Sequence, residues 1–226
     1  MTHTTRVWDL PTRIFHWALF GLIIAMVATG LTGGNAMAWH FRFGYAVLSL
    51  LLFRLVWGLI GGRWSRFASF IYSPGTVLQY LRGQGRPEHS VGHNPLGAGS
   101  VFALLFFLFA QVGTGLFSDD DIAASGPLSK FVSNAMVRSL TGYHKNIGKY
   151  VLLALVLLHI AAIVFYLVKK KENLIGPMLH GDKSLANRVE NSRDDGRSRA
   201  LALGVFAICA ALVATLVRLA DGPING

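Results

Sequence analysis

Hydrophobic residues gather into five long blocks that polar segments separate. The blocks cover residues 14–31, 41–60, 98–117, 147–168 and 200–219, and each runs for roughly 18–22 residues, the length of a membrane-spanning helix. At about 1.5 Å of rise per residue, such a helix crosses a hydrocarbon core of about 30 Å and satisfies its own backbone hydrogen bonds. The pattern predicts an all-α integral membrane helical bundle with five transmembrane helices.

Composition favours a membrane protein over a soluble enzyme. Of 226 residues, 53% are hydrophobic and only 14% are charged, against about a quarter charged in an ordinary soluble domain. The first block is not flanked by a basic stretch and a small-residue cleavage site, so we expect a retained helix rather than a removable signal peptide.

The net charge of +10 is distributed in a way that indicates membrane topology rather than nucleic-acid binding. If the N-terminus is cytoplasmic, the connections on that side hold 14 of the 21 Lys and Arg residues. Cytoplasmic loops of membrane proteins carry such an excess. We therefore expect a multi-pass protein surrounded by membrane lipid, with a cytoplasmic N-terminus, a periplasmic C-terminus and no nucleic-acid partner.

Four of the eight histidines lie within the hydrophobic blocks or at their ends. A titratable ring in hydrocarbon is costly, so each is a candidate functional residue. His16 and His159 share one predicted depth, and His40 and His144 share the other. His159 follows His144 by 15 residues, which is roughly 22 Å along a helix and about 60° around it, so both rings can face one interior.

Two imidazoles at each depth suit a six-coordinate haem, because the porphyrin leaves two axial positions on the iron. We expect two haem b groups with bis-His iron ligation, one by His16 and His159 and one by His40 and His144. The single Cys209 and the lack of a CxxCH motif indicate non-covalent haem. An interhelical hydrogen bond is an alternative for any one histidine. A zinc or copper site would need cysteines or carboxylates at ligand spacing, which the blocks lack. A proton relay would need an intramembrane Asp or Glu, which they also lack.

Four groups of short motifs occur in order along the chain. They are Arg13-Ile-Phe-His16-Trp17 with Thr29-Gly30-Leu31, His40-x-x-x-Gly44 with Arg54-Leu-Val-Trp57-Gly58, Gly92-His93-Asn94-Pro95-Leu96-Gly97 with Thr114-Gly115-Leu116, and His144-x-x-x-Gly148 with Leu158-His159-Ile160. The ordered set resembles the bacterial cytochrome b561 and nickel-iron hydrogenase b-type cytochrome family over about residues 6–180. The resemblance implies haem ligation by the same four histidines, electron exchange with quinone or quinol, and a place in the bacterial inner membrane.

The resemblance also suggests how the chain is organised. Residues 1–180 are expected to form a cytochrome b561-like di-haem domain of four transmembrane helices. Residues 181–226 would then supply a cytoplasmic linker and a fifth transmembrane helix, which is more like the larger hydrogenase-type subunits.

Two further residues have candidate roles beside the haem at His16 and His159. Arg54 follows His40 by 14 residues, so it lies about 21 Å deeper. There it could pair with a haem propionate or extend to the lipid headgroups. His93 precedes the third helix, where it could contact a quinone headgroup or the haem edge, with a pKa near neutrality suited to proton exchange. Alternatively, it could cap the helix and pack the loop.

The outer connection, residues 118–142, is long and starts with Asp119, Asp120 and Asp121. A long loop without an element of its own is often functional, so these acids could dock a basic c-type cytochrome or another redox subunit. Alternatively, the loop could cap the haem at His40 and His144, which is the pair expected near the outer face.

These observations predict electron transfer across the bilayer between the quinone pool and a periplasmic redox partner such as a c-type cytochrome, a hydrogenase or a dehydrogenase. Six-coordinate iron has no open position for a substrate, so we expect an electron-transfer subunit more than a stand-alone enzyme. One alternative is a quinol-linked oxidoreductase that acts alone on a small species such as superoxide. Another is a haem-free scaffold or transporter whose histidines connect helices.

Overall fold

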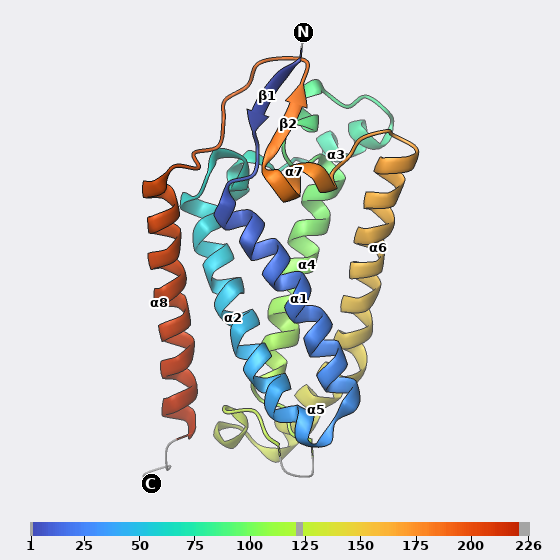
Figure 1. Cartoon of the computed structure of the whole chain (residues 1–226). Helices are drawn as coiled ribbons and strands as arrows, with labels where there is room; N and C mark the ends of the chain where they lie inside the picture. The colour runs from blue at the N-terminus through green and yellow to red at the C-terminus, as the bar shows by residue number, and fades with distance from the viewer. Residues whose placement is uncertain (1, 121–123, 222–226) are drawn as a thin grey trace. The chain divides into compact units, whose positions relative to one another are not determined.

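The computed structural model describes residues 2–120 and 124–221, which are mostly helical (Figure 1). Within these residues, five helices are long and apolar enough to cross a membrane, which confirms the predicted all-α membrane fold. They are α1 (Leu10–Thr32), α2 (Met37–Ile60), α4 (Pro95–Gly115), α6 (Lys149–Val168) and α8 (Gly196–Asp221).

Short polar side chains fix where two of these helices begin. Asp9 Oδ1 accepts a hydrogen bond from the Thr12 amide at the start of α1, at 2.8 Å. Asn94 Oδ1 accepts one from the Gly97 amide at the start of α4, also at 2.8 Å. Such caps satisfy amides that have no partner within the helix. The cap of α4 is therefore Asn94, and not its neighbour His93.

The helix that carries His144 begins much earlier than its hydrophobic block. Helix α5 (Asn134–Gly142) leads through a π-helical turn, η6 (Tyr143–Gly148), directly into α6. The expectation that His144 opens a helix is therefore wrong, as is the expectation of an outer connection without an element of its own. Charged residues such as Arg138 and Lys145 interrupt the hydrophobic pattern here while the helix continues.

The polar connections contain more regular structure than their composition predicts. Strand β1 (His3–Arg6) pairs antiparallel with β2 (Asp182–Leu185), so that His3 lies opposite Leu185 and Arg6 opposite Asp182 (Figure 1). Two short helices also lie in the polar connections: α3 (Pro74–Leu81) between α2 and α4, and α7 (Ile175–His180) between α6 and β2. The remaining 3-10 turns are η1 (Gly34–Ala36), η2 (Arg63–Ser65), η3 (Phe67–Ser69), η4 (Pro87–Ser90) and η5 (Ser129–Phe131).

The chain divides into two compact units. The first unit takes its residues from 1–16, 54–103 and 155–205, and the second from 17–53, 104–154 and 206–226. A buried cluster in the first unit joins β1 to the connections: Val7, Trp8, Val91 and Leu185, with Trp64, Met178 and Val189 packed against it. Buried residues of the second unit include Val47, Leu51, Phe53, Leu108 and Val213.

Candidate haem sites

Each predicted histidine pair meets within one compact unit. In the first unit, the rings of His16 on α1 and His159 on α6 have centroids 6.5 Å apart, with 52° between their planes. In the second unit, the rings of His40 on α2 and His144 on η6 have centroids 6.1 Å apart, with 86° between their planes. The four residues therefore form two pairs of facing imidazoles.

The orientation of His40 is set by helix α1. Its Nδ1 lies 3.0 Å from the Met26 carbonyl oxygen and 3.3 Å from Thr29 Oγ1. A carbonyl oxygen only accepts, so this contact requires a proton on Nδ1. The tautomer then leaves Nε2 without a proton and able to bind a metal ion.

His144 has the same surroundings, supplied by helix α4. Its Nδ1 lies 2.8 Å from the Gln111 carbonyl oxygen and 3.5 Å from Thr114 Oγ1. In both helices the threonine hydroxyl also donates to a carbonyl one turn earlier, from Thr29 to Ala25 and from Thr114 to Ala110, at 2.7 Å. The Thr-Gly-Leu segments at 29–31 and 114–116 therefore build two equivalent supports for the two rings of one site.

A glycine after each threonine makes room for the ring. A Cβ atom at Gly30 would lie 3.0 Å from His40 Cε1, and one at Gly115 would lie 2.9 Å from His144 Cε1. Real Cβ atoms essentially never approach as closely as at Gly115, and the distance at Gly30 is tighter than nearly all real Cβ contacts, so a larger residue at either position would press on the imidazole. The two glycines explain how α1 and α4 come close enough to hold the histidines.

The π-helical turn adds a further constraint at His144. Gln111 Nε2 donates to the His144 carbonyl oxygen at 3.0 Å, and a Cβ atom at Gly148 would collide with Gln111 Oε1. Single π-turns inside α-helices are frequent at functional sites. The backbone position of His144 is therefore fixed by the π-helical turn together with Gln111 and Gly148.

The donors in both sites suit haem iron better than a bare metal ion. Among the residues that the structure describes, no group of three or more His, Cys, Asp or Glu side chains could hold a metal ion, whereas structural zinc takes four such ligands. Two metal–nitrogen bonds of about 2 Å each separate two facing nitrogens by about 4 Å. Each ring centroid lies further from the metal than its nitrogen does, so the observed centroid separations of 6.5 Å and 6.1 Å are compatible with this geometry. A porphyrin supplies the four ligands that the chain does not.

Arg54 of α2 lies deep in the first unit. It is 3% exposed, and its guanidinium stacks over the Phe67 ring, with Cζ 4.6 Å from the centroid. Its Nη1 is buried and has no hydrogen-bond partner among the described residues. The Asp9 carboxylate acts on this cation electrostatically, but no hydrogen bond among the described residues satisfies Nη1. A buried donor left unsatisfied is costly, so this atom could bind an anionic group such as a haem propionate.

His93 is enclosed by aromatic rings in the same unit. Its ring centroid lies 4.7 Å from that of Trp8 and 4.4 Å from that of Phe70. Burial, together with the positive charge of Arg54, lowers the pKa of the His93 imidazole to about 3. The expected pKa near neutrality is therefore wrong for this environment, and His93 is neutral at physiological pH. Its Nδ1 is buried without a partner in the described part of the chain.

A fully buried carboxylate ties α1 to the end of α2. Asp9 accepts hydrogen bonds from Trp57 Nε1 at 3.2 Å, from the Gly62 amide at 3.0 Å and from Ser65 Oγ at 2.9 Å, besides that from the α1 amide. These bonds satisfy both carboxylate oxygens. Asp9 is therefore occupied by its own network and fixes the helix ends that carry His16 and Arg54.

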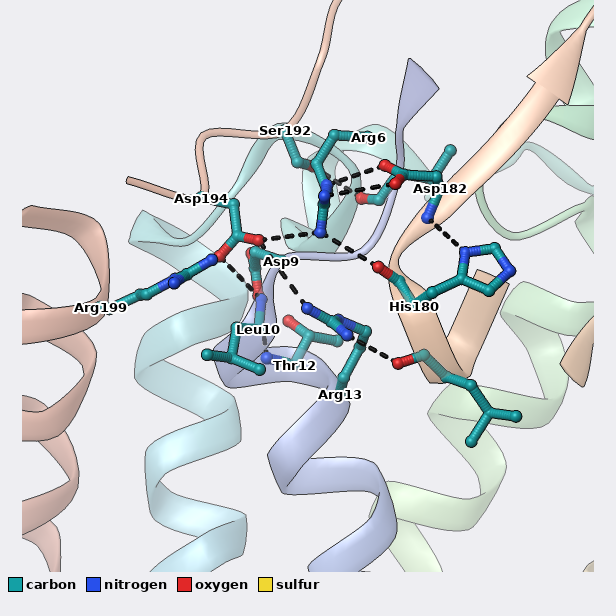
Figure 2. A network of polar contacts seen from close by, with 12 residues as sticks. Arg6, Asp9, Leu10, Thr12, Arg13, His180, Asp182, Ser192, Asp194 and Arg199 are labelled. Carbon is teal, nitrogen blue, oxygen red and sulfur yellow. Dashed lines mark hydrogen bonds and ion pairs between the residues drawn. The ribbon is translucent and has the colours of Figure 1, made fainter. Parts of the chain in front are cut away.

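A second network joins the N-terminal strand to the segment before α8 (Figure 2). Asp194 accepts from Arg6 Nη1 at 3.2 Å, from Arg199 Nε at 3.1 Å and from the Leu10 amide at 3.0 Å. Arg13 also lies near it, with Nη2 3.8 Å from Asp194 Oδ2. No spacing in the sequence indicates the role of this carboxylate, because its partners come from distant parts of the chain.

Two residues of the acidic run in the outer connection form local hydrogen bonds, one through its carboxylate and one through its backbone amide. The Asp120 side chain accepts from the Ala124 amide at 2.9 Å, and the Asp119 amide donates to Thr141 Oγ1 at 3.0 Å. Asp121, the third member of the run, lies outside the described residues. A docking role for these acids stays a prediction.

Comparisons with known proteins agree with the motifs. The family described as prokaryotic cytochrome b561 matches residues 7–181. Two relatives, from Rhizobium leguminosarum bv. viciae and Bradyrhizobium diazoefficiens, are named "Probable Ni/Fe-hydrogenase B-type cytochrome subunit". A third, from Escherichia coli K12, is named "Probable Ni/Fe-hydrogenase 1 B-type cytochrome subunit". Their identities are 25%, 26% and 22%, and the alignments cover 81%, 80% and 79% of this chain and 90%, 86% and 90% of the relatives. No solved structure matches the chain.

Proposed function

Because this chain belongs to the prokaryotic cytochrome b561 family, we propose that it is the di-haem subunit that connects a Ni/Fe hydrogenase to the membrane quinone pool. Family membership makes it a multi-pass b-type cytochrome of electron transport. The number of haems, their ligands, the quinone and the hydrogenase belong to the proposal. The two facing histidine pairs are the observation that carries it.

The chain's own residues would bind and orient the cofactors. His16 and His159 would ligate one haem b, and His40 and His144 the other. At the second site, Thr29 and the Met26 carbonyl would fix the tautomer of His40. Thr114 and the Gln111 carbonyl on α4 would do the same for His144. Haem b, when bound, supplies one-electron transfer without an open coordination position.

Arg54 and His93 would complete the site in the first unit. The unpaired Arg54 Nη1 is placed to neutralise a propionate, and the neutral His93 ring, held between Trp8 and Phe70, could line the haem edge or a quinone headgroup. Because its pKa is low, His93 would act as a neutral hydrogen-bonding group rather than as an acid that exchanges protons near neutral pH.

The names of the relatives favour a hydrogenase as the redox partner over a c-type cytochrome or a dehydrogenase. Oxidation of H₂ gives two protons and two electrons, and a quinone takes up two electrons and two protons to become quinol. The subunit would carry the electrons between these reactions across the bacterial inner membrane. Its basic connections support a cytoplasmic N-terminus and a periplasmic C-terminus.

Haem content and ligation test the cofactor part of this proposal. A pyridine haemochrome assay on the purified chain should give two b haems, and His16→Ala or His40→Ala should each remove one spectral species and leave the other. His3→Ala, at an exposed position in β1, is the matched control. One haem in the unaltered chain would show that one pair is misassigned.

Membranes that contain the hydrogenase test the partner. Addition of H₂ should reduce the b haems, and a soluble quinone should then reoxidise them. A chain that reduces or oxidises superoxide with quinol or quinone, and does not respond to H₂, would instead support the stand-alone oxidoreductase. Membership of a b-type cytochrome family already argues against the haem-free scaffold or transporter.

A further inference from the structure

A groove in the second unit lies between α2 and α8. Its volume is about 760 Å³, within the range of about 300–1,000 Å³ typical of small-ligand sites. It belongs to neither histidine pair, because none of the four histidines lines it. The groove therefore needs an explanation of its own.

Two helix faces form the walls of this groove. Helix α2 contributes Arg42, Ala46 and Ser49, and α8 contributes Ala210, Ala214 and Arg218. Within each helix these residues are three or four positions apart, so they lie on one face. The small side chains leave space between the two helices, and Val213 and Val217 add apolar surface to it.

An arginine from each helix gives the groove a positive charge. Arg42 lies in the second turn of α2 and Arg218 in the last turn of α8, so both are near the ends of their membrane-spanning helices. Arg42 stacks on Trp39, with Cζ 4.9 Å from the ring centroid. Neither arginine forms an ion pair within residues 2–120 and 124–220.

The charge favours an anionic lipid over other occupants. A second copy of this chain would bring the same two cations to the same face, where they would repel each other. A zwitterionic lipid offers its phosphate together with a cationic group. Guanidinium groups match phosphate oxygens in geometry as well as in charge, so two arginines at one groove suit an anionic headgroup.

We propose that the groove between α2 and α8 is a binding site for one anionic phospholipid. Arg42 and Arg218 hold the phosphate of the headgroup, and the face formed by Ala46, Ala210 and Ala214 receives an acyl chain. The lipid fills the space between α8 and α2 and thereby attaches the fifth helix to the rest of the second unit.

Lipid retention by the purified full-length chain tests this site. The haem-loaded protein is exchanged into micelles with equal amounts of phosphatidylglycerol and phosphatidylcholine, and bound lipid is counted by native mass spectrometry. We expect one retained phosphatidylglycerol per chain. Arg42→Gln and Arg218→Gln should each weaken its retention roughly fivefold, and the double variant more, since each arginine near an anionic headgroup contributes separately.

Two matched variants separate this site from general charge attraction. Arg138→Gln removes a cation of the same unit that does not line the groove, and it should retain the lipid. Ala214→Leu fills the groove and keeps both arginines, and it should lose the lipid. The haem absorption spectrum shows whether each variant is folded.

Other results would overturn the proposal. Equal retention of the two lipids, unchanged retention in the double arginine variant, or displacement of the lipid by inorganic phosphate alone would each show that no phospholipid site exists here. A stable dimer that Arg42→Gln strengthens would show that the groove binds a second copy instead.

Discussion

A Cβ atom at Gly115 would lie 2.9 Å from Cε1 of His144. The helix that supports the ring thus approaches it as closely as a glycine allows. The same relationship joins Gly30 to His40 at 3.0 Å. The position of each ring in this pair therefore depends on a residue that has no side chain.

Replacement of Gly115 by alanine should displace His144 and weaken the haem at the His40–His144 site. Overpacking of this kind costs about 1–3 kcal/mol, and the strain falls directly on a proposed ligand. Low-temperature electron paramagnetic resonance should show one of two low-spin signals shifted or lost. Gly113→Ala is the control, since a Cβ there has nothing within 4 Å. Equal effects of the two substitutions would contradict this explanation.

Replacement of Thr114 by valine should raise the midpoint potential of the same haem. The Thr114 hydroxyl lies 3.5 Å from His144 Nδ1 and can accept part of its hydrogen bond, which makes the imidazole more electron-donating. Loss of a weak contact worth about 0.5 kcal/mol corresponds to roughly 20 mV for one electron. Redox titration measures the shift, and Thr32→Val, whose hydroxyl bonds only the Ala28 carbonyl in α1, should leave the potential unchanged.

Replacement of Arg54 by glutamine should lower the midpoint potential of the haem at His16 and His159. Removal of a buried positive charge favours the oxidised, more positive iron. A change on the order of 1–2 kcal/mol, as for a charge-assisted hydrogen bond, corresponds to several tens of millivolts. Arg54→Lys should restore part of the loss. Arg63→Gln, which removes an exposed arginine paired with Glu190, should have no effect, and a similar shift there would argue against the propionate contact.

Protonation of Asp194 should lower the stability of the first unit in acid. Burial raises the pKa of this carboxyl, but hydrogen bonds from Arg199 and the Leu10 amide outweigh that effect and leave the pKa below its ordinary value. A lowered pKa in the folded state stabilises the protein above the unfolded value of about 3.9. That contribution is lost as the pH falls through the folded pKa.

Asp194→Asn should show the same loss already at neutral pH, on the order of 1 kcal/mol because solvent screens the exposed arginines. Thermal unfolding in detergent at pH 7 and pH 3.5 measures it. The variant should be less stable than the unaltered chain at pH 7, and the difference should shrink in acid. Glu190→Gln, at an exposed ion pair, is the control. A constant difference at both pH values would exclude Asp194 as the titrating group.

The positions of the four histidines follow from the sequence because helix geometry is local. A span of 15 residues from His144 to His159 fixes both depth and direction, even though η6 inserts a π-turn at its start. The groups that hold the histidine rings in place are harder to predict in this way. The Thr-Gly-Leu repeat was visible as a family motif, but its contact with His40 and His144 needs the packing of one helix against another.

The networks around Asp9 and Asp194 lie further beyond sequence reasoning. Asp194 binds Arg6, which is 188 residues away along the chain, and no spacing rule connects them. His93 shows a different limit: its position before α4 follows from the sequence, but its pKa depends on burial between Trp8 and Phe70. Burial of this kind comes from tertiary packing and has no local signature.

The pairing of β1 with β2 sets an order of assembly. His3 precedes α1 in the chain, whereas its partner Leu185 follows α1, α2, α4 and α6. Strand β1 therefore has no pairing partner until four membrane-spanning helices have been synthesised. A chain that stops before residue 182 lacks β2, so this small sheet can close only after the fourth membrane-spanning helix has been made.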